Sequence, residues 1–127
     1  MRKPFIVIVD GDPSVRKSLE RLLKAAGFET MTFACARGFL ERGDLAQTPE
    51  CLVIDTHLDG MNGFELYEYL VAAGSAIPII FMTAHDDALT RERARKIGVC
   101  LRKPFEQHAL LGAIYRALKQ EEDSLIA

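Results

Sequence analysis

The alternation of short apolar runs with segments of helical periodicity most constrains how this chain can fold. Residues 5–9 form an apolar run rich in β-branched side chains, which is typical of a strand buried on both faces. Strands joined by helical crossovers form parallel sheets with helices on both faces. The sequence therefore predicts a doubly wound α/β fold with five parallel strands, and the flavodoxin-like order 2-1-3-4-5 is the first choice. The expected strands cover 5–9, 29–33, 51–54, 79–82 and 99–101, and the expected helices about 13–26, 36–42, 64–71, 86–97 and 106–120.

Capping residues support several of these boundaries. Asp12 followed by Pro13 is typical of a helix start, and Gly27 stands where a C-terminal cap is expected. The predicted fourth helix has few apolar positions, so it should contribute least to the core. Residues 43–50 are expected to form a polar loop. We predict one domain over 1–127, with 1–120 as folded core and 121–127 as a frayed tail.

Composition narrows the class of protein. The 127 residues are 49% hydrophobic and carry a formal charge of −2, which does not favour binding to nucleic acid or to an anionic membrane. No apolar run reaches the roughly 20 residues needed to span a bilayer, and Met1 to Pro4 lead straight into a strand, so no signal peptide is expected. Three cysteines without CxxC spacing predict reduced, mostly buried thiols and a cytoplasmic protein.

Polar residues follow the predicted strands where each one ends. Asp10 and Asp12 follow the first, Asp55 the third, Thr83 the fourth and Lys103 the fifth. The carboxyl ends of parallel strands meet at one edge of a sheet, so these side chains should converge. Clustered carboxylates favour an oxygen-preferring cation such as Mg²⁺. A carboxylate can attack a phosphoryl donor, while an ammonium and a hydroxyl stabilise the transferring group.

Four motifs in order resemble the receiver domains of two-component response regulators. They are Val9-Asp10, Ile54-Asp55 with 61–66 (MNGFEL), 81–84 (FMTA), and 103–105 (KPF). The similarity covers essentially the whole chain, and 12–16 (DPSVR) together with 103–105 (KPF) is most similar to receivers of the nitrogen-fixation regulator type.

The resemblance implies a role for each of these residues. Asp55 accepts a phosphoryl group from a histidine kinase or phosphotransfer protein. Mg²⁺ is held by Asp10, Asp55 and the main-chain carbonyl of His57. Thr83 and Lys103 bind the phosphoryl oxygens, and Thr83 reports the phosphorylated state to an unknown downstream protein. The resemblance also implies a cis peptide at Lys103-Pro104 and a homodimer through the fourth helix and fifth strand.

Several positions depart from the family pattern. Gly11 replaces a second acid that is normally a metal ligand, which predicts weaker Mg²⁺ binding. Asp12 is a doubtful substitute, because its position favours a helix cap. Asp59 stands at the usual proline, and Cys100 replaces the aromatic switch residue. Because residues 83–103 also form a slightly shorter segment than usual, we expect an altered output face.

Alternative functions remain open from the sequence. The departures allow a receiver-like interaction module that works without phosphorylation. Asp10-Gly11-Asp12 also resembles the nucleophile motif of haloacid-dehalogenase-type phosphatases, although Lys103 follows the paired acids where that family has it before them. We expect no enzyme beyond slow self-dephosphorylation, and His57 and His85 are interpreted as solvated rather than metal-binding. The sequence fits a stand-alone receiver and part of a longer regulator equally well.

Overall fold

The computed structural model describes residues 3–42, 48–84 and 87–126, with side chains up to Lys119. Strands and helices alternate along the chain. They are β1 (Phe5–Val9), α1 (Pro13–Ala25), β2 (Glu29–Phe33), α2 (Ala36–Leu40), β3 (Cys51–Asp55), α3 (Gly63–Ala72), β4 (Ile79–Thr83), α4 (Ala88–Ile97), β5 (Val99–Arg102) and α5 (Gln107–Ile126).

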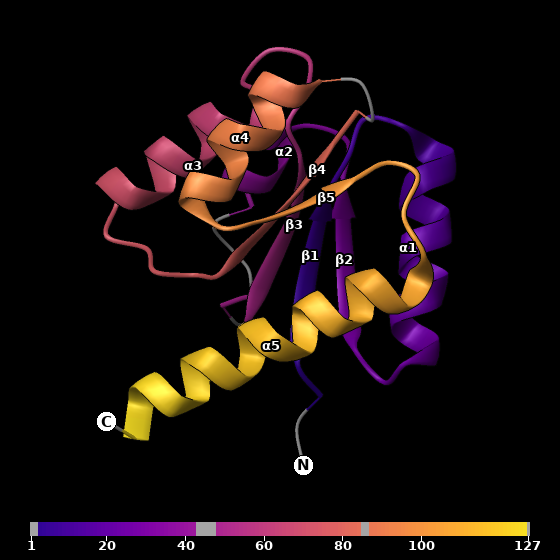
Figure 1. Ribbon diagram of the computed structural model, residues 1–127, viewed down its shortest axis with the longest axis vertical. Helices are drawn as coiled ribbons and strands as arrows, with labels where there is room; N and C mark the ends of the chain where they lie inside the picture. Colours follow the sequence, from indigo (N-terminus) through magenta and orange to yellow (C-terminus); the bar gives the residue numbers. More distant parts are fainter. Residues whose placement is uncertain (1–2, 43–47, 85–86, 127) are drawn as a thin grey trace.

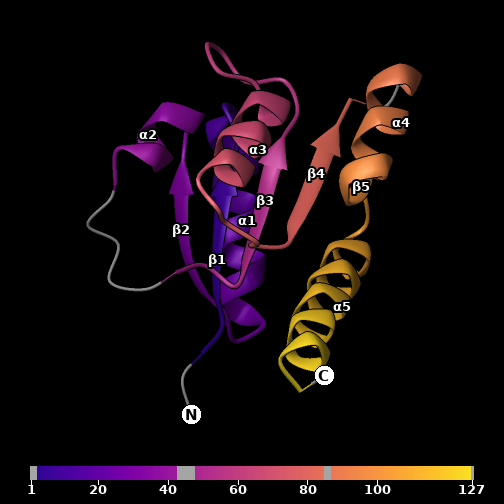
Figure 2. The same ribbon diagram turned by 90° about the vertical axis from the view of Figure 1, so that its left-hand side faces the viewer.

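The strands form one parallel sheet in the order β2-β1-β3-β4-β5, which confirms the predicted fold class. Helices cover both faces of the sheet: α1 and α5 lie on one side, and α2, α3 and α4 on the other (Figures 1 and 2). All strands point the same way, so their carboxyl ends share one edge. Polar side chains at that edge come from strands far apart in the chain.

Two apolar cores follow from the alternation of side chains along each strand. Ile6 and Ile8 pack with buried residues of α1 and α5, whereas Val7 and Val9 pack with those of α2, α3 and α4. All five residues of β1 are buried, because this central strand has helices on both of its faces. Two-sided burial explains why the run is continuously apolar rather than alternating.

Helix ends follow the predicted caps with some differences. Asp12 is the N-cap of α1 and Pro13 its first residue, and Gly27 takes a positive φ of 95° just beyond the cap residue Ala26. α2 ends at Leu40, earlier than predicted. α5 continues to Ile126, so its predicted end near Gln120 was too early. No glycine or proline follows Gly112 to interrupt the helix. Most of the polar loop expected at 43–50 lies outside the described residues.

α4 has fewer fully buried residues than the other described helices, in line with its few apolar positions. Ala94 is its one fully buried residue, and Leu89 is 82% exposed. The cap of the helix is Asp87, which accepts a hydrogen bond from the Thr90 amide. Among the described residues, no helix is long and apolar enough to cross a membrane.

Candidate functional site

Three charged side chains meet at the carboxyl edge of the sheet. Asp10 directly follows β1, Asp55 is the last residue of β3, and Lys103 follows β5. The Lys103 ammonium lies 2.8 Å from Oδ2 of Asp10 and 3.0 Å from Oδ2 of Asp55. Lys103 therefore joins two acids that are 45 residues apart in the sequence, as the strand order predicts.

Backbone amides engage the remaining carboxylate oxygens. The amide of Asp12 donates to Oδ1 of Asp10 at 2.8 Å, and the amide of His57 donates to Oδ1 of Asp55 at 2.9 Å. Arg16 of α1 donates to the main-chain carbonyl of Asp10 at 2.8 Å. Each carboxylate is thus oriented by its own loop before any ligand binds, which is the preorganisation that electrostatic catalysis requires.

Burial and charge oppose each other in this cluster. Asp10 is 1% exposed, whereas the side chains of Asp55 and Lys103 are 13% and 27% exposed. Burial raises the pKa of the Asp55 carboxyl above its ordinary value, although the His57 amide and Lys103 act against this. Burial disfavours the Lys103 ammonium, but hydrogen bonds to Asp10 and Asp55 outweigh it and raise the pKa of Lys103. Asp55 is therefore less stabilised as an anion than Lys103 is as a cation.

Close backbone packing places the loop after Asp55. A Cβ on Gly63, the first residue of α3, would lie 2.7 Å from the main-chain oxygen of Asp55 and 3.0 Å from Cα of Thr56. Real Cβ atoms do not approach this closely, so the position requires glycine. Asn62 caps α3 through a reciprocal pair of hydrogen bonds with Glu65. The Asn-Gly motif therefore places the start of α3 directly against the end of β3.

Thr83 has no hydrogen-bond partner for its hydroxyl. It ends β4, is fully buried, and pairs in register with Arg102, which precedes Lys103. Its main-chain oxygen accepts a hydrogen bond from the Lys103 amide at 2.8 Å. A buried hydroxyl without a partner is costly, so this oxygen is a candidate donor for a ligand that enters the site. Thr56 has a similarly unpartnered buried hydroxyl.

A pocket of about 670 Å³ opens over the two acids and is walled by the loops after β1, β2 and β3. The Asp12 side chain accepts a hydrogen bond from the Ser14 amide at 2.8 Å, which is the cap role that its position favoured. A Cβ on Gly11 would come no closer than 3.8 Å to another atom, so a side chain fits there. Asp59 lines the same pocket from the β3–α3 loop.

The carboxylates that line this pocket offer oxygen ligands, which suits Mg²⁺. The ammonium of Lys103 already lies between Asp10 and Asp55, so the two acids can share a cation. Within residues 3–42, 48–84 and 87–126, however, no three histidine, cysteine or acidic side chains cluster closely enough to hold a metal by themselves. The residues fit a cation held by two carboxylates and completed by a carbonyl and water.

The structure also contains a contact that the sequence did not predict. Nε2 of His57 lies 3.0 Å from Oδ2 of Asp87, so it joins the loop after Asp55 to the start of α4. Hydrogen bonds from Thr90, with a smaller contribution from His57, hold the pKa of Asp87 below its usual value. Neither residue alone suggests this pairing. His85, which was interpreted as solvated, and Asp86, the first residue of the predicted fourth helix, lie outside the described residues.

The three cysteines are free, as expected. Only Cys51 is fully buried, so the expectation of mostly buried thiols was too strong for the half-buried Cys35 and Cys100. Cys100 packs against the core on the side of α3 and α4. Burial raises the pKa of its thiol, opposed by Arg95 and Arg91. Cys100 thus occupies the predicted switch position as a small, apolar residue.

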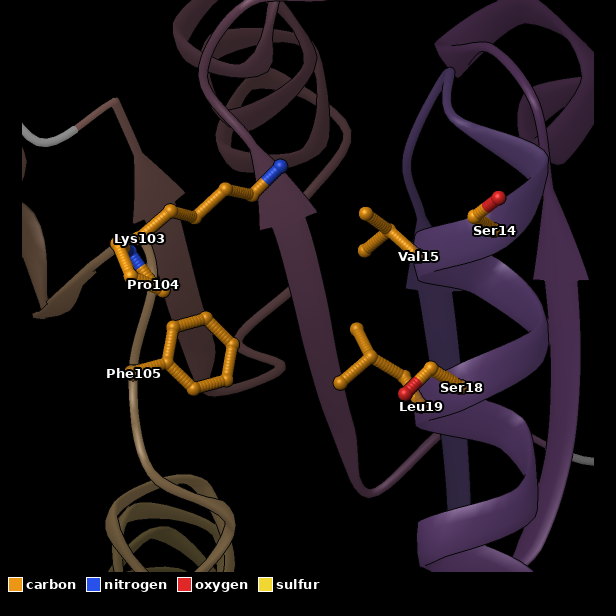
Figure 3. Close-up of a pocket in the computed structure, with 7 residues that line it drawn as sticks. All are labelled: Ser14, Val15, Ser18, Leu19, Lys103, Pro104 and Phe105. Atoms are coloured by element: carbon orange, nitrogen blue, oxygen red, sulfur yellow. The ribbon is translucent and has the colours of Figure 1, made fainter.

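A second pocket lies on the other side of Lys103. It is about 740 Å³ and separates α1 from the β5–α5 loop, where the Lys103-Pro104 peptide is cis as predicted. Figure 3 shows Phe105 on one wall facing Val15 and Leu19 on the other, with the Lys103 side chain extending above them. This pocket is mostly apolar and adjoins the acid cluster through Lys103.

Comparisons with known proteins agree with this arrangement. Residues 6–115 match the family described as the response regulator receiver domain. Transcriptional regulatory protein FixJ of Bradyrhizobium diazoefficiens is 36% identical over 122 residues, which cover 94% of this chain and 59% of that protein. Nodulation protein W of the same organism is 35% identical over 121 residues, covering 94% and 53%. The chain therefore spans little more than half the length of these relatives.

A solved structure of a response regulator has the same fold. The response regulator StyR superposes with a TM-score of 0.84 and 46% identity, covering 97% of this chain and 63% of that one. Neither the matched family nor these relatives favour the phosphatase alternative. The chain belongs to the response regulator receiver domains of two-component signalling systems.

Proposed function

We propose that Asp55 accepts a phosphoryl group from a histidine kinase or phosphotransfer protein and that the resulting acyl phosphate alters the face formed by α4 and β5. The observation that carries this proposal is the position of Asp55. It ends β3 with an ammonium 3.0 Å from one carboxylate oxygen, beside an open pocket. We place the reaction in the cytosol, consistent with three free cysteines.

Besides the phosphorylated donor, the transfer needs only a proton from solvent. A carboxylate oxygen of Asp55 attacks phosphorus, and the phosphorus–nitrogen bond of the donor's phosphohistidine breaks. The histidine nitrogen keeps the bonding electron pair and takes a proton from solvent. The Lys103 ammonium stabilises the negative charge that develops on the phosphoryl oxygens. The unpartnered hydroxyl of Thr83 donates a hydrogen bond to one of these oxygens.

Mg²⁺ would be held by Asp10, Asp55 and the carbonyl of His57. Bound there, it supplies charge neutralisation for the transferring group. In its absence the two acids depend on Lys103 alone for a cation, as the distances of 2.8 and 3.0 Å indicate. With the acids neutralised by the metal, Lys103 would be available to bind the phosphoryl oxygens.

This chain presents an apolar surface on which the phosphoryl donor can dock. The pocket between α1 and the β5–α5 loop presents Val15 and Phe105 directly beside Lys103 (Figure 3). Covering this pocket buries apolar surface and brings a donor protein within reach of the acid cluster. We therefore propose that the histidine kinase or phosphotransfer protein covers this pocket.

Phosphorylation by a small donor tests the acceptor. Incubation with acetyl phosphate and Mg²⁺ should add the mass of one phosphoryl group to the wild type, and hydroxylamine should remove it. Asp55→Asn should show no gain under the same conditions. Absence of any gain in the wild type, with acetyl phosphate and with a cognate kinase, would instead support the module that works without phosphorylation.

Comparing a phosphorylated kinase with acetyl phosphate as the donor tests the docking surface. Ser18→Glu places a charge at the rim of the apolar pocket without touching the acids. It should slow transfer from a phosphorylated kinase at least tenfold and leave labelling by acetyl phosphate unchanged. Thr48→Glu, at an exposed position before β3 and outside the apolar pocket, is the control and should change neither rate. Equal transfer to Ser18→Glu and to the wild type would argue against this docking surface.

A further inference from the structure

Asp59 lines the acid pocket that also contains the position where the family's second acid is missing. Gly11 stands in that position, after Asp10, and contributes no carboxylate. Asp59 comes from the β3–α3 loop and lines the same pocket as Gly11, Asp55 and Lys103. Compared with the family pattern, the pocket therefore lacks an acid from the β1–α1 loop and has an additional acid from the β3–α3 loop.

We propose that Asp59 acts as the third acid of the Mg²⁺ site by binding water molecules of the hydrated ion, and so compensates for Gly11. The inference rests on the proposed Mg²⁺-dependent function and identifies a residue that determines metal affinity. Asp59 is a positioning residue in this arrangement, because it reaches the metal through water rather than directly.

The other acids at this pocket are already engaged. Oδ1 of Asp12 accepts the Ser14 amide as the cap of α1. Both oxygens of Asp10 accept hydrogen bonds, as do both of Asp55. Asp59 is exposed, and in the described part of the chain its carboxylate has no hydrogen-bond or ion-pair partner. It is thus the acid in this wall that is free to bind metal-bound water.

An indirect contact agrees with the geometry. No three acidic, histidine or cysteine side chains of the described residues lie close enough to enclose a metal directly. Mg²⁺ loses its water reluctantly and commonly keeps several water molecules in protein sites. Carboxylates beyond the inner ligands orient such groups and raise affinity. Asp59 therefore needs to approach only the hydration shell of an ion held by Asp10 and Asp55.

The negative charge of Asp59 should contribute to the affinity of the pocket for Mg²⁺. Asp10 and Asp55 carry two negative charges and Lys103 one positive charge, so the cluster without Asp59 has a net charge of about −1 when all three are ionised. A further carboxylate in the same pocket increases the attraction for a divalent cation even at the distance of one water molecule. Because Asp59 is exposed, salt should screen this contribution strongly.

Calorimetric titration with Mg²⁺ alone, without a phosphoryl donor, tests the proposal. Asp59→Asn should raise the Kd for Mg²⁺ by about three- to tenfold at low ionic strength. Asp12→Asn is the matched control, because it removes a charge from the same pocket and asparagine still caps a helix. It should raise the Kd less than twofold. Equal effects of the two variants, or none for Asp59→Asn, overturn the proposal.

Ionic strength and a restored acid sharpen the result. The difference in Kd for Mg²⁺ between the wild type and Asp59→Asn should shrink in about 0.5 M KCl, because salt screens exposed charges. A difference that persists unchanged overturns the water-mediated contact. Gly11→Asp has room for its side chain and should tighten Mg²⁺ binding. In that background Asp59→Asn should have a smaller effect than in the wild type, and an undiminished effect contradicts compensation.

The same proteins separate this proposal from the proposed function. Wild type that binds Mg²⁺ with the predicted Asp59 dependence but takes no phosphoryl group overturns the acceptor role and leaves the metal contact standing. Phosphorylation of Asp55 with equal Kd values for the wild type and Asp59→Asn does the reverse. A wild type that binds no Mg²⁺ overturns the Asp59 proposal.

Discussion

The acceptor edge and the α4–β5 face differ in how firmly their side chains are held, by hydrogen bonds in the first and by burial in the second. At the acceptor edge, defined as Asp10, Asp55 and Lys103, each of the four carboxylate oxygens has a donor within 3.0 Å. The α4–β5 face, defined as α4 and β5, buries few side chains. Leu89 is 82% exposed and Ala94 is the one fully buried residue of its helix. Thr83 lies between the two regions, with an unpartnered hydroxyl.

This contrast suggests how a local reaction alters a distant surface. A fully hydrogen-bonded edge holds the acceptor in one geometry, whereas a helix with few buried contacts can shift at small cost in free energy. A phosphoryl group on Asp55 would offer the Thr83 hydroxyl the partner it lacks. Drawing Thr83 toward Asp55 would then act on β4 and on the helix that follows it. In the proposed function, the hydrogen-bonded edge would detect phosphorylation and the α4–β5 face would respond to it.

Removal of the ammonium should break the acceptor edge and have the largest effect. Lys103→Met leaves two acids at one edge without their shared cation, and Asp10 is 1% exposed. We expect a loss of about 2–4 kcal/mol in the free energy of unfolding at pH 7 without Mg²⁺. Urea denaturation measures this loss, and added Mg²⁺ should recover part of it. Lys96→Met on exposed α4 is the control. A loss below 0.5 kcal/mol, within the range of ordinary surface substitutions, would show that the edge does not depend on Lys103.

Neutralising the acceptor should have a smaller, pH-dependent effect. The pKa of Asp55 is raised in the folded protein, so the folded state binds this proton more tightly than the unfolded state does. The associated stability is present below the ordinary aspartate pKa and is lost as pH rises through the raised value. Asp55→Asn does not suffer that loss. Without Mg²⁺, it should be more stable than the wild type by about 1 kcal/mol at pH 7 and similar near pH 3.

Thermal unfolding from pH 3 to pH 7 gives the comparison for Asp55. The melting temperature of the wild type should fall relative to that of Asp55→Asn as pH increases. Glu65→Gln alters a capping acid away from the edge and should not reproduce this trend. An Asp55→Asn protein that is less stable than the wild type at pH 7 would mean that Lys103 and the His57 amide outweigh burial.

Thr83 tests the boundary between the two regions. Thr83→Val removes an unpartnered buried hydroxyl with little change in shape, so stability should stay equal or rise by up to about 1 kcal/mol. Binding of beryllofluoride, a mimic of the phosphoryl group, should weaken at least tenfold, while Thr83→Ser should retain it. Thr56→Val is matched in its buried, unpartnered hydroxyl and should leave beryllofluoride binding unchanged. Equal binding by all four proteins would exclude a role for the Thr83 hydroxyl.

The sequence predicted the sheet better than the helix ends and the loop contacts. Strands 5–9 and 29–33 were predicted with their observed bounds. The third, fourth and fifth strands each extend one residue further, to Asp55, Thr83 and Arg102. These polar residues still pair with a neighbouring strand, which an apolar pattern does not show. The end of α5 was missed because the residues after Gln120 neither favour nor break a helix strongly.

The candidate site could be predicted only in part for a related reason. Topology alone brings Asp10, Asp55 and Lys103 to one edge, and the cap role of Asp12 follows from the proline after it. The contact between His57 and Asp87 joins two loops 30 residues apart, and no local pattern encodes it. The unpartnered hydroxyl of Thr83 depends equally on its three-dimensional surroundings.

The smallest effect is expected for Leu89, the most exposed apolar side chain of the α4–β5 face. Leu89→Lys changes an 82% exposed side chain, so the free energy of unfolding should change by less than about 0.5 kcal/mol. Ala94→Leu on the same helix overfills a fully buried position and should cost about 1–3 kcal/mol. Urea denaturation of the two variants measures how much of α4 the fold depends on. A large loss for Leu89→Lys would mean that this face is packed in the free protein, and the contrast with the acceptor edge would then disappear.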